Sequence, residues 1–262
     1  MKKIQAALWM ETLKVRRTNI FPISIYFFIF IGVMMGLLMF LSMHPEIANR
    51  SATINMKTSF LGGSDWTAFF NLLMQLILTL GVIGAGIITS WGFGREFSDR
   101  VVKDLLALPV TRSSIVVSKL IILFVWSILL SLIVLVAAML TGLAVRIPGW
   151  IEGELFPFLK MYMVCAIFNA LLITPVAFVA SAGRGYMLPI SFVILVIIVT
   201  QLLFVGVPGF SYWFPWALPA LYSGVAGALV PPPGFFSYFI YTFTILAGLF
   251  GTIAWWRFAD QK

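Results

Sequence analysis

Six long apolar runs without a charged side chain constrain this chain more than any other feature of its sequence. They cover residues 21–43, 66–94, 120–145, 161–183, 186–207 and 235–256. A helix of about 20 apolar residues crosses the hydrocarbon core of a bilayer, so each run is long enough to span a membrane. Hydrophobic residues make up 61% of the chain and charged residues 10%, a balance far outside the range of soluble domains. The sequence predicts an all-α polytopic membrane protein with six transmembrane helices, forming a single transmembrane domain over residues 1–262.

The basic residues predict the orientation of these helices. An even number of spans puts both termini on one side, and basic residues accumulate on the cytoplasmic side of membrane proteins. If the termini are cytoplasmic, that side holds thirteen of the 17 Lys and Arg residues: Lys2, Lys3, Lys14, Arg16, Arg17, Arg95, Arg100, Lys103, Arg112, Lys119, Arg184, Arg257 and Lys262. We therefore expect a multi-pass protein of the cell membrane with both termini in the cytoplasm. Because the basic residues flank apolar spans, they indicate topology and not a nucleic-acid partner.

The segment before the first span, residues 1–19, is predicted to form an interfacial helix. Ala6, Trp9, Met10 and Leu13 follow the i, i+3, i+4, i+7 spacing of one helical stripe. Basic residues surround this stripe, as in helices that lie among lipid headgroups. The alternative is a basic flank that is helical only because the first span continues through it.

The segment between the fifth and sixth spans, residues 208–235, contains no charged residue but six prolines. An exposed loop would be more polar, and so many prolines would break a seventh span. Short re-entrant helices at the outer membrane face satisfy both observations. The alternative is an apolar loop lying flat on the outer leaflet. Its aromatic residues Tyr212, Trp213 and Trp216 are candidates for an outer gate, or they serve only as interfacial anchors.

The sequence lacks the common motifs of catalytic, nucleotide-binding and ion-coupling sites. The runs hold no charged residue of the kind that ion-coupled transporters place near the midplane. There is no phosphate-binding loop, no H-E-x-x-H and no G-x-S-x-G. We therefore expect no catalytic residue, no metal site and no cofactor on this chain.

Uncharged polar residues within the spans leave two interpretations open. Asn71, Gln75 and Asn169 are candidates for a substrate path. Such residues more commonly join helices through interhelical hydrogen bonds.

The connection between the second and third spans predicts a short amphipathic helix over residues 98–109. Ser98 is a candidate N-cap and Pro109 a stop signal. The apolar face carries Val101, Leu105 and Leu108, and the opposite face carries two i, i+4 ion pairs, Asp99 with Lys103 and Arg100 with Asp104. Physics alone leaves two positions open for this helix, a groove on a partner protein or the bilayer surface.

The same stretch resembles a known family. Residues 95–119, with the pattern R-E-F-S-D-R-V-V-K-D-L-L-A-L-P-V-T-R-S-S-I, are similar to the E-x-x-x-x-T-x-x-x-L-L-x-x-P-x-S/T-R signature of ABC-2 type permeases. Small bacterial members also resemble this chain in length, six spans and a basic N-terminal helix. The resemblance implies a coupling helix that docks on an ATPase. It implies coupling roles for Glu96, Asp99, Arg100, Val101, Lys103, Asp104, Leu105, Leu106, Leu108, Pro109 and Arg112, although Val101 stands where the family often has Thr.

The resemblance also implies the partners. In the family, the permease works as a homodimer, or as a heterodimer with a similar permease, together with two copies of a separate ABC ATPase. ATP and Mg would bind to that ATPase, and this chain would only contact it and the membrane lipids. We expect export of an amphipathic substrate, such as a peptide antibiotic, a lipid-like or a drug-like molecule, from a bacterial cell or membrane. The alternative from another class is a membrane-embedded scaffold or assembly factor that holds a cytoplasmic partner without transport.

Overall fold

A computed structural model describes residues 2–44, 46, 63–99, 111–225, 227, 230 and 232–258 of the chain. Every regular element in these ranges is a helix. The elements are α1 (Lys2–Arg17), α2 (Ile20–Met43), α5 (Trp66–Ser98), α7 (Arg112–Val145), α8 (Leu155–Leu171), α9 (Ile173–Gly183), α10 (Met187–Gly206), the 3-10 helices η1 (Pro208–Trp213) and η2 (Pro215–Ala217), α11 (Leu218–Ser223) and α12 (Phe235–Phe258).

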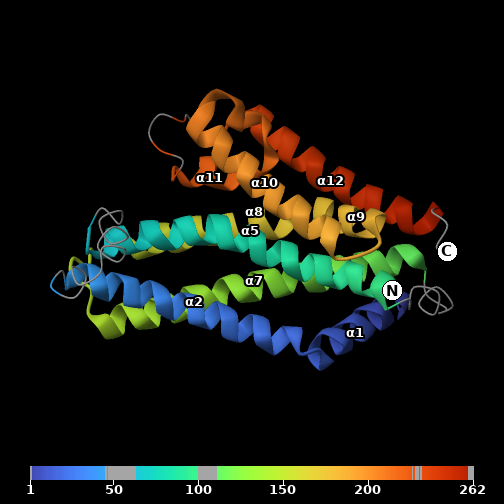
Figure 1. Cartoon of the computed structure of the whole chain (residues 1–262), viewed down its shortest axis with the longest axis horizontal. Coiled ribbons are helices and arrows are strands. Elements are labelled where there is room, and N and C mark those ends of the chain that lie inside the picture. Colours follow the sequence, from blue (N-terminus) through green and yellow to red (C-terminus); the bar gives the residue numbers. More distant parts are fainter. Residues whose placement is uncertain are drawn as a thin grey trace.

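The prediction of six membrane-spanning helices is confirmed within these described ranges. Six helices, counting the α8–α9 pair as one, are long and apolar enough to cross a membrane. Figure 1 shows α2, α5, α7 and α8 running alongside one another, with α10 and α12 lying together across them. The start of α1 and the end of α12 lie at the same end of the molecule, as an even number of spans requires.

The N-terminal segment forms a helix of its own. Thr18 and Asn19 separate α1 from α2, and Figure 1 shows the chain bending between the two helices. α1 is therefore not a straight extension of the first span. Its place among lipid headgroups stays a prediction.

Helices α2 and α7 pack closely because two glycines face small side chains. A Cβ atom on Gly32 would lie 2.7 Å from Cβ of Ala137, and one on Gly36 would lie 2.5 Å from Cβ of Thr141. The Thr141 hydroxyl donates to the backbone oxygen of Gly32 at 3.3 Å. This is the small-residue packing expected between helices in lipid, where no hydrophobic force pulls them together.

The fourth span is broken between α8 and α9, a feature that the sequence analysis did not predict. Pro175 has no N–H to donate to the carbonyl of Leu171. The hydroxyl of Thr174 lies 3.3 Å from that carbonyl oxygen and 3.0 Å from the carbonyl oxygen of Ile245 in α12, and its single proton is shared between the two acceptors. A side chain thus offers a partial donor to the carbonyl that proline leaves without one and also joins α9 to α12.

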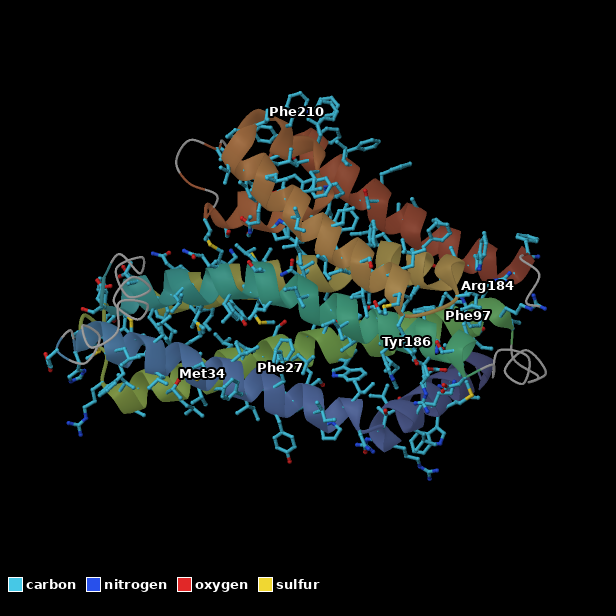
Figure 2. All side chains as sticks on the ribbon, in the orientation of Figure 1. Phe27, Met34, Phe97, Arg184, Tyr186 and Phe210 are labelled. Atoms are coloured by element: carbon cyan, nitrogen blue, oxygen red, sulfur yellow. The ribbon has the colours of Figure 1, made fainter. Side chains whose placement is uncertain are left out.

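The segment after α10 folds into the three short helices η1, η2 and α11. Buried residues hold it against the bundle, and the Cys165 thiol on α8 lies 3.5 Å from the carbonyl oxygen of Pro219. Phe210 projects from the outermost tip and is exposed (Figure 2). The segment is thus helical in short pieces, and its re-entry into a membrane stays a prediction.

Large apolar side chains cover much of the outer surface of the helices. On α2 they include Tyr26, Phe27 and Phe30, which are each more than half exposed. Figure 2 shows such side chains projecting outward along the length of α2 and α12. An exposed surface of this kind is stable only when lipid or another membrane protein covers it.

The contact between α9 and α12 provides a test of this packing. A methyl group on Gly248 would overlap the backbone of Thr174 and Pro175, whereas one on Gly251 would meet only the ring of Phe178 at 3.1 Å. We expect Gly248→Ala to lower the free energy of unfolding by about 1–3 kcal/mol, because backbone cannot move aside as a ring can. Gly251→Ala, one turn later in the same helix, is the matched control and should change the melting temperature in detergent less. Equal shifts for the two variants would contradict this packing.

Candidate functional site: a buried charge cluster

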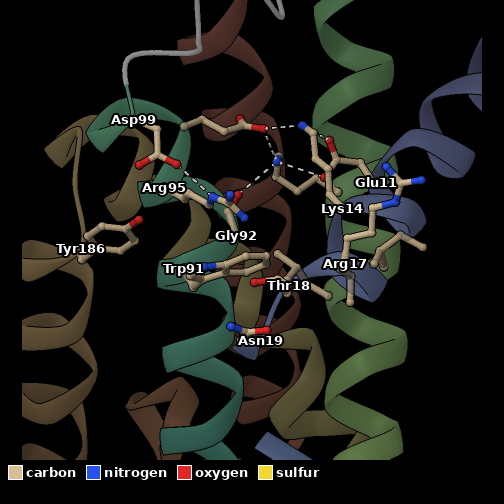
Figure 3. Close-up of a pocket in the computed structure, with 15 residues that line it drawn as sticks. Glu11, Lys14, Arg17, Thr18, Asn19, Trp91, Gly92, Arg95, Asp99 and Tyr186 are labelled. Atoms are coloured by element: carbon tan, nitrogen blue, oxygen red, sulfur yellow. Dashed lines mark hydrogen bonds and ion pairs between the residues drawn. The ribbon is translucent and has the colours of Figure 1, made fainter. Parts of the chain in front are cut away.

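The candidate site lies where α5 ends and α7 begins, on either side of residues 100–110. Four charged side chains meet there from three helices: Glu11 and Lys14 from α1, Glu96 from α5 and Lys119 from α7. Figure 3 shows Glu11 and Lys14 reaching from α1 toward the end of α5. We call these four residues the charge cluster.

Lys119 is the centre of the charge cluster. Its ammonium group lies 2.7 Å from Oε1 of Glu96, 3.2 Å from Oε2 of Glu11 and 3.0 Å from the backbone oxygen of Gly92. An ammonium group has three N–H donors, so each one has an acceptor. Its Nζ also lies 5.6 Å from the centroid of the Phe93 ring. Lys119 therefore joins α1, α5 and α7 at a single point.

Lys14 completes the cluster from the side that faces solvent. Its ammonium group lies 3.0 Å from both Glu11 and Glu96. Burial alone would raise the pKa of Glu11, but the ammonium groups of Lys119 and Lys14 outweigh burial and leave that pKa below its ordinary value of 4.5. Glu11 is therefore ionised at neutral pH. The stability that it contributes is present above its ordinary pKa and is lost as the pH falls through the lowered value.

The charges of the cluster balance, and most of it is buried. Glu11 and Glu96 are each 4% exposed and Lys119 is 3% exposed. Oε2 of Glu96 is buried and has no hydrogen-bond partner among the described residues. Removing one partner from a buried ion pair leaves an uncompensated charge, which is far more destabilising than the loss of a surface pair. The cluster thus fixes α1 on the bundle strongly.

The structure corrects one expectation about this region. Ser98 is the last residue of α5 and not the N-cap of a separate helix, because α5 continues without a break from Trp66. The helices are also longer than the charge-free runs 66–94 and 120–145, so Glu96 and Lys119 lie in the same helices as these runs. The charge-free runs end before Arg95 and begin after Lys119, so their pattern did not indicate the cluster.

Two further residues of the predicted coupling region can be placed. Asp99 accepts a hydrogen bond from Nε of Arg95 at 2.9 Å, and both side chains are 46% exposed. Arg112 donates from Nη1 to the backbone oxygens of Trp256 and Arg257 at 3.2 and 3.3 Å, which ties the start of α7 to the end of α12. The remaining predicted coupling residues lie outside the described residues: Arg100, Val101, Lys103, Asp104, Leu105, Leu106, Leu108 and Pro109.

The three candidate path residues separate into two groups. Asn71 and Gln75 are exposed one turn apart on α5. Asn169 is instead 3% exposed, and its Nδ2 donates to the backbone oxygen of Ile77 at 2.8 Å. The structure therefore does not bring Asn169 to the exposed face of Asn71 and Gln75, and it assigns this side chain to the packing of α8 on α5.

The three candidate gate residues lie on the short helices. Trp213 is 61% exposed, with its ring 6.1 Å from that of Phe236. Trp216 is half-buried, and its ring contacts that of Phe192 on α10 at 5.5 Å. Tyr212, also half-buried, belongs to η1 with Trp213.

Metal-binding side chains do not gather in the parts of the chain that the structure describes. No group of three or more His, Cys, Asp or Glu residues there could hold an ion.

Removing the Lys119 charge tests the cluster. We expect Lys119→Met to lower the free energy of unfolding by about 3–5 kcal/mol, because Glu11 and Glu96 then lack a buried counter-charge. Arg95→Gln, which breaks the exposed pair with Asp99, is the control and should change it by about 1 kcal/mol or less. Thermal unfolding in detergent measures both.

The double variant Lys119→Met/Glu96→Gln separates charge balance from packing. It leaves one acid and one base in the cluster, so it should be more stable than Lys119→Met alone. A double variant that unfolds at a lower temperature than Lys119→Met would argue against the electrostatic account.

Comparisons with known proteins show which family the chain belongs to. A family model described as ABC-2 family transporter protein matches residues 7–201, which include all four residues of the charge cluster. The bacitracin transport permease protein BCRB of Bacillus licheniformis is 31% identical over 193 residues, covering 73% of this chain and 91% of the relative. These findings confirm the resemblance found in the sequence. The chain belongs to the ABC-2 transporter family, as a multi-span membrane permease.

Proposed function

We propose that this permease is the membrane subunit of an ATP-driven exporter and that a separate ATPase drives it through residues 98–109. A permease of this family implies an ATPase partner. Two permeases, identical or similar, would pair with two copies of that ATPase, with both termini in the cytoplasm. ATP and Mg would bind on the ATPase chain.

The observation that carries this proposal is the charge cluster at both ends of the connecting segment. The chain leaves α5 at Ser98 and enters α7 at Arg112. Glu96 and Lys119, close to these two points, are bonded to each other at 2.7 Å. A force on the connecting segment would therefore move the end of α5 and the start of α7 together. The α1 side chains of the cluster extend the same connection to α1.

Replacing Leu105 and Leu106 with Asp tests the docking of the connecting segment. Each buried leucine stabilises an interface by about 1.5–3 kcal/mol, and an unpaired carboxylate in an apolar groove opposes docking further. We expect the double Asp variant to lose co-purification of the ATPase and substrate-stimulated ATP hydrolysis. The double Met variant at the same positions keeps apolar volume and should retain both. Parent-level co-purification and export by the double Asp variant would refute the docking role.

The substrate path is proposed to follow the exposed face of α5 that carries Asn71 and Gln75. Amide side chains are poorly solvated by lipid tails, so an exposed pair on a spanning helix indicates a face covered by water, substrate or a second permease. Thr79, one turn further, lines a small cavity together with Thr200 and Gln201 of α10 and with Trp216. The three aromatic residues of the candidate gate would then close the outer end of this path.

The substrate class is proposed from this lining and from the relative. A path with amide, hydroxyl and aromatic groups among aliphatic side chains suits an amphipathic molecule, such as a peptide antibiotic, a lipid-like or a drug-like compound. Bacitracin transport in the name of the Bacillus licheniformis relative supports this class. Bacitracin is therefore the first substrate to test.

Substituting the two amides with leucine tests the path. We expect Asn71→Leu/Gln75→Leu to lower bacitracin export by at least about tenfold, the effect of roughly 1.4 kcal/mol, while ATPase co-purification stays unchanged. Ile87→Leu, an exposed apolar position on the same helix, is the control and should export at the parent rate. If α5 instead faced lipid here, the double Leu variant would export normally and unfold at a higher temperature.

A further inference from the structure

A cavity of about 630 Å³ lies beside the charge cluster. Its walls come from the elbow between α1 and α2, from the last turns of α5, from α7 and from Tyr186, which precedes α10 (Figure 3). This volume is in the range of sites that bind small molecules. The four residues of the charge cluster form part of its wall. They are already paired with one another, so the cluster does not explain why a cavity is open beside it.

Among the described residues, most of the charged side chains that line this cavity are already paired with one another, and one is not. Three carboxylates line it, and each already has a partner: Glu11 and Glu96 bond to lysines of the cluster, and Asp99 bonds to Arg95. Of the four basic residues that line the cavity, Arg17 is the one without an ion pair to a described residue. The lining therefore has a net charge of about +1, from four bases against three acids, and the unsatisfied charge is an exposed guanidinium.

Neutral donors follow this arginine in the chain. Thr18 and Asn19, which form the elbow between α1 and α2, line the cavity in Figure 3 below the end of α5. The Asn19 side chain does not cap α2. Arg95 adds a guanidinium 5.4 Å from the ring centroid of Trp91 on the opposite wall. Guanidinium, hydroxyl and amide groups together are typical donors to phosphate oxygens.

The depth of the cavity relative to the bilayer identifies the source of such a phosphate. The elbow is the point where the basic helix α1 ends and the apolar span α2 begins. Trp91 and Tyr186 on the cavity wall are residues that favour the headgroup region. With the termini in the cytoplasm, as proposed above, this level is the headgroup layer of the cytoplasmic leaflet.

We propose that this cavity binds the phosphate ester of an anionic phospholipid from the cytoplasmic leaflet, with Arg17 as its main cationic contact. The lipid headgroup enters between the α1–α2 elbow and the end of α5, and its acyl chains stay in the bilayer. Bound there, it braces α1 against α5 beside the charge cluster. The proposal rests on the orientation and not on transport, so it is tested without an ATPase.

The test uses the purified full-length chain in detergent and counts bound lipids by native mass spectrometry during titration with phosphatidylglycerol. We expect one molecule to bind more tightly than the rest, and Arg17→Gln to weaken that molecule about fivefold, the effect of one basic residue at an anionic surface. Arg16→Gln is the matched control, because Arg16 is the exposed neighbour on α1 that does not line the cavity. It should change the affinity less than about twofold.

Two further ligands distinguish the sources of the phosphate. Phosphatidylcholine, which carries the same phosphate without a net charge, should bind more weakly than phosphatidylglycerol. Soluble glycerol phosphate should not displace the lipid at equal concentration. Equal losses for the two arginine variants, no loss for Arg17→Gln, or equal binding of phosphatidylcholine would overturn the proposal. Displacement by glycerol phosphate would overturn the assignment to a lipid.

Discussion

The burial of the Lys119 ammonium group is the constraint on which this end of the molecule depends. A lysine inside a helix bundle is stable only if every N–H has an acceptor and the charge has a counter-charge. Lys119 finds these on α1 and α5, in Glu11, Glu96 and the carbonyl of Gly92. Gly92 also lets α7 approach, since a Cβ there would lie 2.9 Å from methyl carbons of Leu123. The requirements of one side chain thus join three helices at this point.

The sequence was sufficient to predict the spans and the helix at the N-terminus, because lipid demands long apolar helices and the chain has six. It was not sufficient to predict the charge cluster. Glu11, Glu96 and Lys119 are far apart in the chain, and nothing in their local patterns indicates that they meet. Each one alone looks like an ordinary flank of a span. The break before Pro175 could have been suspected from the proline, but the role of Thr174 depends on the packing of α12.

The membrane also changes how the surface of this molecule should be interpreted. On a soluble protein, the exposed Phe27 and Phe30 would need an explanation. In a membrane protein, lipid is the expected solvent for such side chains. The exposed amide side chains of Asn71 and Gln75 do need an explanation, because lipid tails offer no hydrogen bonds. Asn169 shows the contrast, since its amide donates to a backbone oxygen inside the bundle. Exposure and chemistry together therefore separate a candidate path from helix packing, although the three residues look alike in the sequence.

The connections at the α1 end suggest how a force would pass between the helices of the bundle. Lys119 holds α7 to α5 and α1 through charges, while Arg112 holds α7 to α12 through two backbone oxygens at the end of a helix. Uncharged acceptors bind a guanidinium less strongly than carboxylates do, so the second connection is the weaker one. A force on the segment between Asp99 and Thr111 would therefore reach α1, α5 and α7 through charges. It would reach α12 through the weaker Arg112 connection and through the buried Trp256 ring, which packs against Phe93 and Phe97 of α5.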